Sequence, residues 1–404
     1  MRTSRLFTIL MMLLAAGLTM GSNAQFKKEF TKNPISDIVL IYQGNLQRPD
    51  WTIDQFTPYV THTYGDGSRS WLFQGFIFIE FATKEVAYIN SMKNKRNAVK
   101  TDWEWLLNRV FEKNKALDAL DKCIERQKAT LGAPPFRHKV ILCLPVPIKD
   151  QTDWGKIGSS RMDFSKEKDQ LKAVEWYMNE LLKRFKNGGY KNIDLEGFYW
   201  VEEDMVVVKD AMLKQVSDMV HKAGKRFYWS PYNFARGCMK WDSAGFDYAY
   251  MQPNYVIKAK HDEDYLTGAI EKAKNADMAL EFDFDQKLLL QPDQYIPRLS
   301  KAIDIYEQGH VFDDCALIYY DGGGTLMSIY EGVDPHYGKV DKKRYSAVLD
   351  RLARHIVNRW PSNGTTYQLP NNPYTNGTVN TPSQPSVNEP KKSYDWRDPE
   401  YWHF

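Results

Sequence analysis

Eight short runs of β-branched and aromatic residues recur along the middle of this 404-residue chain, and they constrain its fold more than any other feature. The runs are Ile38–Gly44, Gly75–Phe81, Lys139–Pro147, Ile193–Glu202, Arg226–Asn233, Phe246–Tyr255, Met278–Asp285 and Cys315–Gly322. Most are almost continuously apolar, which is typical of parallel strands that are buried on both faces.

Amphipathic stretches of helical length separate most of these runs. They are Trp103–Asn114, Ala116–Thr130, Glu167–Phe185, Met205–Ala223, Asp262–Asn275 and Pro292–Gln308, with Lys342–Asn358 after the last run. Only the link over residues 234–245 is too short for a full helix. This alternation predicts an α/β fold, a (β/α)8 TIM barrel with loop insertions at its C-terminal face. An open doubly wound sheet is the alternative, but it lacks the expected glycine fingerprint at residues 43–49.

The two ends of the chain differ from the middle. A basic start, an apolar run over residues 6–20 and small residues up to Ala24 predict a cleavable signal peptide over residues 1–24, with an uncleaved anchor as the alternative. We therefore expect an exported protein, periplasmic or extracellular, with a barrel domain at 25–360 and no integral membrane segment in the mature chain. Residues 361–404 form a Pro/Asn/Thr-rich tail. Its aromatic end, 391–404, is expected to dock on the domain or a partner, or to stay disordered.

Charge and cysteine usage exclude several classes of protein. Lysine and arginine number 54 against 51 acidic residues, without the basic excess of a nucleic-acid binder. The four cysteines lie far apart and form no CxxC pair, so we expect mostly buried free thiols. The eight histidines show no HxH or HExxH spacing. We predict no metal, no cofactor and no nucleic-acid partner.

Carboxylates gather on one side of two predicted strands. Barrel side chains alternate between the interior and the helix layer, and the helix layer must be apolar. The residues expected to face inward are Asp194, Glu196, Phe198, Trp200 and Glu202 in the fourth strand, followed by Glu203, and Glu281, Asp283 and Asp285 in the seventh. Close buried carboxylates shift one another's pKa, which suits a proton donor beside an ionised group. For Asp194 and Glu196, pairing with Lys or Arg is the alternative.

Amide and aromatic residues gather where the strands end. The predicted substrate-binding residues are Trp200, Trp229, Tyr232, Asn233, Gln252, Asn254, Tyr255, Asp285, Tyr320 and Asp321. Amides and phenols hydrogen-bond hydroxyl groups, and Trp and Tyr present flat faces to sugar rings. For each tyrosine, ordinary packing is the alternative. The glycines at 322–324 and the Asp283–Asp285 DxD pair are weak signs of phosphate or metal binding.

These strand-end patterns resemble two groups of proteins. GFYWVEE (197–203), YWSPYN (228–233), GFDYAYMQPNY (245–255) and EFDFD (281–285) are similar to a family of secreted bacterial proteins, domain of unknown function 4855. The chain also looks like a (β/α)8 glycoside hydrolase of the large retaining clan. That resemblance implies an acid/base Glu after strand four, matched by Glu202 or Glu203, and a nucleophile on strand seven, matched by Glu281 or Asp283. The Asn that precedes the acid/base Glu in that clan is absent here.

The sequence thus favours a secreted glycoside hydrolase-like protein that acts on a glycan. Glu202, with Glu203 as second choice, would protonate the glycosidic oxygen, and Asp283 or Glu281 would attack the anomeric carbon or activate water. A non-catalytic carbohydrate-binding barrel of a glycan-uptake system is the alternative, which needs the aromatic platform but no acid pair. Phosphate-ester or lyase chemistry is a third hypothesis.

Overall fold

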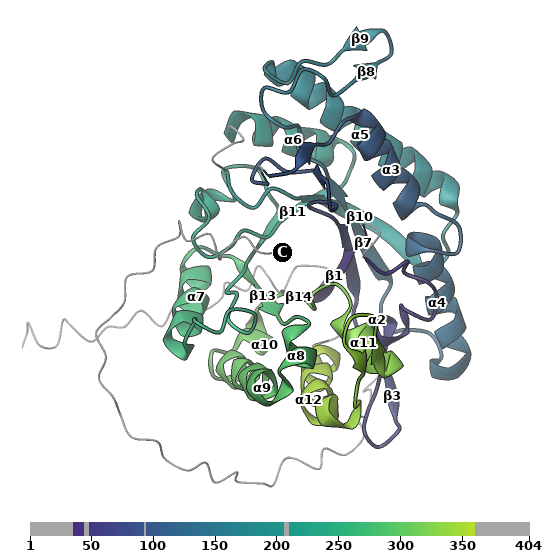
Figure 1. The fold of residues 1–404 in the computed structure, drawn as a ribbon, viewed down its shortest axis with the longest axis vertical. Helices are drawn as coiled ribbons and strands as arrows, with labels where there is room; N and C mark the ends of the chain where they lie inside the picture. The colour runs from purple at the N-terminus through teal and green to yellow at the C-terminus, as the bar shows by residue number, and fades with distance from the viewer. Residues whose placement is uncertain (1–34, 44–47, 93, 206–209, 360–404) are drawn as a thin grey trace, which may run out of the picture.

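A closed barrel of eight parallel strands occupies the centre of the structure, a computed structural model that describes residues 35–43, 48–92, 94–205 and 210–359 (Figure 1). The barrel strands are β1 (Asp37–Tyr42), β4 (Gly75–Ile79), β7 (His138–Leu144), β10 (Ile193–Trp200), β11 (Arg226–Trp229), β12 (Tyr248–Met251), β13 (Ala279–Asp283) and β14 (Leu317–Tyr320). Their order around the barrel follows the chain, and β14 closes against β1. The TIM barrel is confirmed, and each predicted run coincides with one strand. The predicted signal peptide and tail lie outside the described residues.

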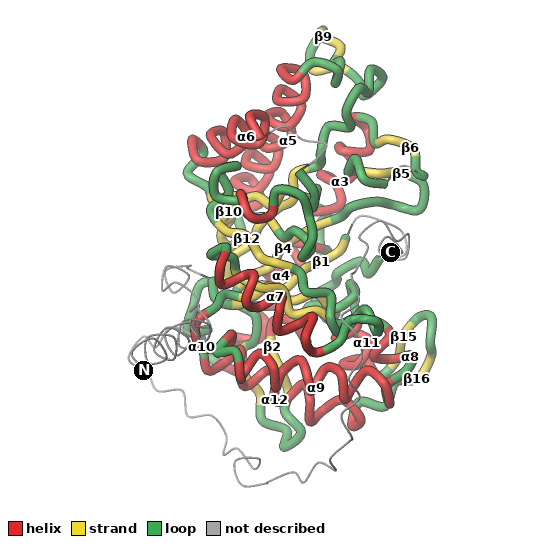
Figure 2. The backbone as a smooth tube through the Cα atoms, turned by 90° about the vertical axis from the view of Figure 1, so that its left-hand side faces the viewer, coloured by secondary structure: helices red, strands yellow, loops and turns green. Residues whose placement is uncertain are grey.

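Helices surround the barrel in both ribbon views (Figures 1 and 2). The longer ones are α3 (Lys100–Val110), α4 (Ala116–Leu131), α5 (Glu167–Gly188), α6 (Asp210–Lys222), α7 (Glu263–Asn275), α9 (Pro292–Gln308) and α12 (Lys343–Asn358). The shorter ones are α2 (Thr57–Val60), α8 (Lys287–Leu290), α10 (Val311–Asp314), α11 (Thr325–Glu331) and the 3-10 helix η2 (Cys238–Lys240). Each predicted helix is present, and η2 alone fills the link that was predicted to be too short.

The long helices form where periodicity and end signals coincide. Glu167 and Asp169 in the first turn of α5 complement its dipole, and Gly189 ends it in the left-handed region at φ 63°. Helix α12 buries the residues of one face, namely Tyr345, Val348, Leu349, Leu352, Ala353, Ile356 and Val357. These residues belong to the hydrophobic core, and α12 packs beside α9 (Figure 1).

Small two-stranded sheets lie in the loops between the barrel strands and helices. They pair β2 (Thr61–Thr63) with β3 (Arg69–Trp71), β5 (Val86–Ala87) with β6 (Arg96–Asn97), β8 (Lys156–Ile157) with β9 (Ser160–Arg161) and β15 (Val333–Asp334) with β16 (Gly338–Lys339). The last three pairs lie in connections that leave the C-terminal ends of β4, β7 and β14. The predicted insertions at the C-terminal face are therefore present.

Strand β10 contains a bulge that decides which side chains reach the barrel interior. Leu195 pairs with Val140 of β7 and Gly197 with Ile141, so Glu196 is an extra residue. An extra residue inverts the side-chain alternation of everything that follows it. A Cβ atom on Gly197 would overlap the carbonyl oxygen of Arg226 on β11, so this close approach requires glycine.

The N-terminal part of β10 carries ion pairs. Asp194 lies 2.9 Å from Nη2 of Arg137 and 3.2 Å from Nζ of Lys139, and Glu196 lies 3.8 Å from the same lysine nitrogen. The alternative that these two carboxylates pair with Lys or Arg is therefore confirmed. They belong to the scaffold at the N-terminal end of the barrel, away from the side where barrel enzymes carry out their chemistry.

Cys123, Cys143, Cys238 and Cys315 are all buried and free, as predicted. None of the helices within the described ranges has both the length and the apolar character needed to cross a membrane.

Candidate active site

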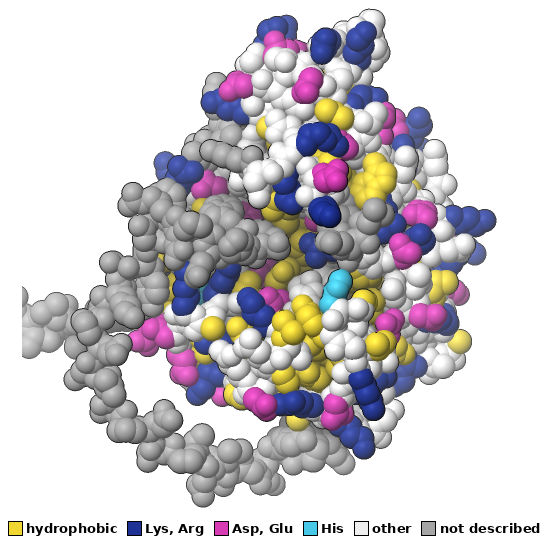
Figure 3. All heavy atoms as spheres, in the orientation of Figure 1, with side chains coloured by type: hydrophobic (Ala, Val, Ile, Leu, Met, Phe, Trp, Pro, Cys, Tyr) yellow, Lys and Arg dark blue, Asp and Glu magenta, His cyan; other side chains and the backbone are white. Residues whose placement is uncertain are grey.

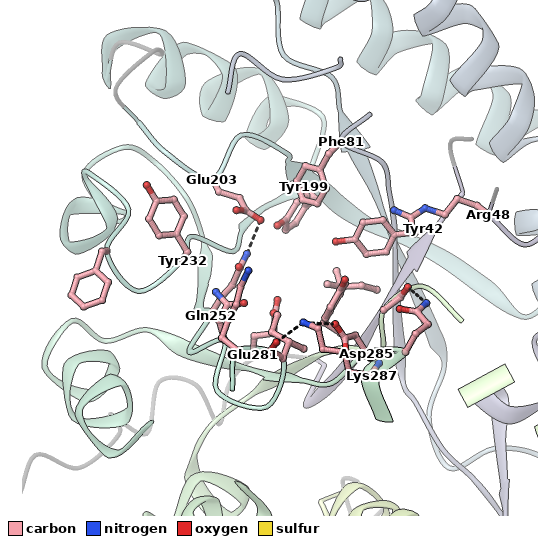
Figure 4. A pocket seen from close by; sticks show the side chains of 18 residues that line it. Tyr42, Arg48, Phe81, Tyr199, Glu203, Tyr232, Gln252, Glu281, Asp285 and Lys287 are labelled. Atoms are coloured by element: carbon pink, nitrogen blue, oxygen red, sulfur yellow. Dashed lines mark hydrogen bonds and ion pairs between the residues drawn. The ribbon is translucent and has the colours of Figure 1, made fainter. Parts of the chain in front are cut away.

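A cavity of about 290 Å³ opens at the C-terminal ends of the barrel strands (Figure 4). Its polar lining includes Arg48, Glu203, Gln252, Asn254, Lys258, Glu281, Asp285, Gln286 and Lys287. Its aromatic lining consists of Tyr42, Phe81, Tyr199, Tyr232, Phe234 and Tyr320. Ring faces next to amides and carboxyl groups are the chemistry that recognises a hydroxyl-rich ligand with flat faces.

Two carboxyl groups, from barrel strands four and seven, face this cavity. Oε1 of Glu203, just after β10, accepts a hydrogen bond of 2.8 Å from Nε2 of Gln252. Oε2 of Glu281, in the middle of β13, lies 3.4 Å from Oγ of Ser230. Nε2 of Gln252 also donates to the carbonyl oxygen of Ser230 at 2.7 Å, so these two residues connect the carboxyl groups.

Burial raises the pKa of both carboxyl groups. At Glu203, burial and the nearby charge of Glu202 raise the pKa to about 7, while the hydrogen bond from Gln252 opposes the rise. The pKa of Glu281 is raised well above its ordinary value, again chiefly by burial, with repulsion from Asp283 and Glu203 adding to it. Neighbouring buried carboxylates cannot easily ionise together. The pair therefore keeps a proton near neutral pH, and the more deeply buried Glu281 holds it.

The other two acids of β13 and its end have different surroundings. Asp283 is buried outside the cavity lining, where its Oδ2 accepts a 3.1 Å hydrogen bond from the backbone N–H of Ile257, and burial raises its pKa to about 6. Asp285 lines the cavity and lies 3.5 Å from Nζ of Lys287. Across the described ranges, no three His, Cys, Asp or Glu side chains are grouped so that they could hold a metal ion.

Three predicted residues face away from the cavity. Oε2 of Glu202 accepts a 2.6 Å hydrogen bond from the backbone N–H of Asn90. Trp200 is buried in the helix layer, in register with Trp229, which stacks on Phe246 with ring centroids 4.9 Å apart. The prediction that Trp200 and Glu202 point inward is wrong because the bulge in β10 inverts the alternation. Trp229 shares the helix-facing side with its paired neighbour, so its predicted place in the mouth is wrong as well.

Two further predicted residues pack behind the mouth. The guanidinium carbon of Arg298 lies 3.8 Å from the ring centroid of Tyr255, which is buried outside the cavity lining. The side chain of Asn233 is buried, and its backbone N–H donates to the carbonyl oxygen of Gln252 at 3.1 Å. Both hold the ends of strands five and six in place, and their predicted positions in the cavity are wrong.

Asp321 organises the glycine triplet instead of facing the cavity. Its Oδ2 accepts a hydrogen bond of 2.5 Å from the hydroxyl of Tyr59. Its Oδ1 accepts hydrogen bonds from the backbone N–H groups of Gly323 at 3.0 Å and Gly324 at 3.2 Å. These N–H groups are therefore occupied within the protein. The sequence-based suggestion that the triplet cradles a phosphate is not supported by this arrangement.

The remaining predicted residues do line the cavity. They are Glu203, Tyr232, Gln252, Asn254, Glu281, Asp285 and Tyr320. Tyr42 and Tyr199 also line the cavity and were not predicted, although the alternation along strand one would have placed Tyr42 inward. Arg48 was not predicted either. Its guanidinium carbon lies 4.6 Å from the ring centroid of Tyr42, and its Nε lies 3.4 Å from Glu80. Arg48 follows the strand in a loop, where alternation gives no signal.

A family model described as "Domain of unknown function (DUF4855)" matches residues 37–346. The chain belongs to this family. The matched range of the DUF4855 protein contains all eight barrel strands and the two carboxyl groups that face the cavity. No curated protein sequence shows significant similarity to it.

Several solved structures resemble the DUF4855 barrel at low identity. A mutant tryptophan synthase α-subunit of Pyrococcus furiosus is 8% identical, covers 80% of this chain and 98% of its own, and has a TM-score of 0.36. Tryptophan synthase from M. tuberculosis is 8% identical over 81% of this chain and 96% of its own, with a TM-score of 0.36. The intracellular xylanase TsXylA of Thermoanaerobacterium saccharolyticum is 14% identical over 62% of this chain and 78% of its own, with a TM-score of 0.33. At this level of similarity, none of them bears on the chemistry of the cavity.

Proposed function

We propose that this DUF4855 protein hydrolyses glycosidic bonds and that Glu203 and Glu281 are its catalytic pair. The observation that supports this most strongly is that the two carboxyl groups, from barrel strands four and seven, face one cavity and are electrostatically coupled. Glycoside hydrolysis needs one carboxylic acid to protonate the leaving oxygen and one carboxylate to attack the anomeric carbon or activate water.

Hydrogen bonding and burial support one assignment of the two roles. The single hydroxyl proton of Ser230 goes to the carbonyl oxygen of Tyr250, 2.8 Å away, because a carbonyl can only accept. The same hydroxyl lies 3.4 Å from Glu281 and so gives a negative charge there little support, while burial raises the pKa of Glu281 well above its ordinary value. Glu203 accepts from an amide N–H of Gln252, which favours its ionised form. Glu281 therefore acts as the acid and Glu203 as the nucleophile or base, the reverse of the roles that the clan resemblance implies.

The rest of the cavity suits a sugar. Tyr42 and Tyr320 lie edge to face, with ring centroids 5.7 Å apart, and Tyr199 also lines the cavity. Their rings are positioned to contact sugar faces, while Gln252 and Asn254 offer amide groups to hydroxyls. This combination supports a glycan over a purely apolar ligand.

Hydrolysis is tested by incubating the purified protein with a panel of polysaccharides and measuring the reducing ends released. We expect Glu203→Gln and Glu281→Gln to lose at least about a hundredfold in turnover. Glu202→Gln is the matched control, because its side chain faces Asn90 and should leave turnover near the wild-type rate. Binding of a glycan without turnover in the wild type would instead support the carbohydrate-binding barrel.

Leaving groups test the assignment of roles. With an activated aryl glycoside, whose leaving group needs little protonation, we expect Glu281→Gln to recover much of its rate and Glu203→Gln to stay inactive. If Glu203→Gln recovers and Glu281→Gln does not, the roles implied by the clan resemblance are correct.

We also propose that the protein is exported, on the basis of the basic, apolar and small-residue pattern in residues 1–24. N-terminal sequencing of the protein from the periplasmic and medium fractions should find residue 25 first. Recovery of the uncleaved chain from the membrane fraction would instead favour an anchor.

A further inference from the structure

A second cavity of about 620 Å³ adjoins the proposed catalytic cavity and shares three of its lining residues. These shared residues are Arg48, Phe81 and Gln286. The second cavity is lined by residues that follow β1, β4 and β14, and the shared Arg48 lies on the opposite side of the mouth from Glu203 (Figure 4). Figure 3 shows this face of the protein hollowed at its centre, with Lys and Arg side chains around the hollow. A ligand that fills both cavities therefore extends beyond a single sugar at the carboxyl pair.

Positive groups line the outer side of this second cavity. Lys84 is exposed and Lys95 is half-buried, and Nζ of Lys95 donates to the backbone carbonyl of Lys84 at 3.1 Å. His336 completes the rim. No carboxylate among the described residues forms an ion pair with either lysine.

The two acids of the second cavity are buried and already engaged. Glu80 is 1% exposed and lies 3.4 Å from Nε of Arg48. Asp334 is 5% exposed. It accepts hydrogen bonds from the hydroxyl of Ser328 at 2.7 Å and from the backbone N–H of His336 at 2.8 Å. Both acids thus point into the protein, whereas the cationic groups border the open space.

Arg48 lines both cavities, and only one of its guanidinium nitrogens donates a hydrogen bond to a described residue. Its Nε is directed to Glu80, and its guanidinium lies over the ring of Tyr42. Neither Nη1 nor Nη2 has a hydrogen-bond partner among the described residues. Gly323, at φ 78°, makes room for it, since a Cβ atom there would lie 3.0 Å from Nη1. A planar guanidinium with two available nitrogens is suited to a carboxylate or sulfate group.

We infer that the second cavity binds an anionic group of the substrate, so that the substrate is an acidic polysaccharide carrying carboxylate or sulfate groups. This inference rests on the proposed function, because it names the substrate class of the same site. The acidic sugar would occupy the second cavity, against Arg48, Lys84 and Lys95, while a neighbouring glycosidic bond reaches Glu203 and Glu281.

Binding measurements test this inference without turnover. In the full chain carrying Glu203→Gln, calorimetry compares three hexasaccharides: an oligogalacturonate with carboxylates only, a sulfated galactan fragment with sulfates only, and a neutral galactan fragment. We expect at least one acidic hexamer to bind about tenfold more tightly than the neutral one. The difference should shrink as NaCl is raised from about 0.05 to about 0.5 M, because salt screens exposed charges. The arm that binds more tightly identifies carboxylate or sulfate as the recognised group.

Substitutions then localise the effect. The Lys84→Met/Lys95→Met double variant should lose about tenfold in affinity for the acidic hexamer and keep its affinity for the neutral one. Arg48→Met should behave alike. If loss of Arg48 beside buried Glu80 prevents folding, the double lysine variant still gives the result. Lys168→Met, exposed on α5, is the matched control and should change nothing. Equal binding of all three hexamers, or unchanged acidic binding in the double lysine variant, would overturn the inference whether or not the protein hydrolyses glycans.

Discussion

Replacing Glu203, the proposed nucleophile or base, with glutamine should make the protein more stable at alkaline pH. Burial holds the pKa of Glu203 at about 7, compared with 4.5 in an unfolded chain. Below pH 4.5 the group is protonated in both states and ionisation does not oppose folding. As the pH rises to about 7, the unfolded chain releases its proton first, and the free energy of unfolding falls.

The size of this effect follows from the shift. A rise from 4.5 to about 7, at about 1.4 kcal/mol per pH unit, amounts to a loss of about 3 kcal/mol above pH 7. This is an upper bound, because the cavity admits solvent. Glutamine keeps the acceptor for the hydrogen bond from Gln252 but cannot ionise. Glu203→Gln therefore removes the loss and leaves the stability at about pH 4 nearly unchanged.

Urea denaturation, followed by tryptophan fluorescence between about pH 4 and pH 9, measures this difference. The stability curves of the wild type and Glu203→Gln should meet near pH 4 and separate by up to about 3 kcal/mol above pH 7. Glu85→Gln, in the loop after β4, is the control because its side chain is exposed. A difference between wild type and Glu203→Gln that does not change between about pH 5 and pH 8.5 would refute the argument from burial.

Three further predictions concern the same region. Gly197→Ala should lower the free energy of unfolding by about 1–3 kcal/mol in urea denaturation, because its Cβ atom would overlap the carbonyl oxygen of Arg226. Asp321→Asn should cost about 2 kcal/mol in the same assay, since Asp321 holds the glycine loop. The pH profile of kcat/KM should fall as the pH drops below about 7, where Glu203 gains its proton; a fall on raising the pH through 7 would favour Glu203 as the acid.

The barrel could be predicted from the sequence because its determinants are local. Each strand is a short apolar run with turn residues after it, and the amphipathic helices follow the period of 3.6 residues. The run 37–42, for example, is buried at every position, which only a strand covered on both faces permits. The absence of a full helix from the short link that contains η2 could also be predicted, because the link has too few residues for one.

The orientation of the site residues was harder to predict, because one extra residue in a strand reverses the orientation expected for every residue that follows it. One extra residue, Glu196, was enough to exchange Glu202 for Glu203 and to turn Trp200 away from the mouth. The sequence did contain a signal, since Gly197 inside an apolar strand is typical of a bulge or a close backbone approach. Strand seven has no bulge in its pairing with β14, and there Glu281 and Asp285 face the cavity as predicted.

The distribution of cations distinguishes the two ends of the barrel. At the N-terminal end, Asp194 and Glu196 lie within ion-pair distance of the basic side chains of Arg137 and Lys139. At the mouth, Arg48 pairs with Glu80, and Lys287 lies beside Asp285. No ion pair with Lys, Arg or His reaches Glu203 or Glu281 in the described part of the chain, although cations lie in the same cavity. A purely structural carboxylate pair would gain stability from such a partner, whereas a proton donor loses its proton when a cation lies against it. The arrangement therefore lowers the stability at this point, and the proposed proton transfer would account for two carboxyl groups in that state.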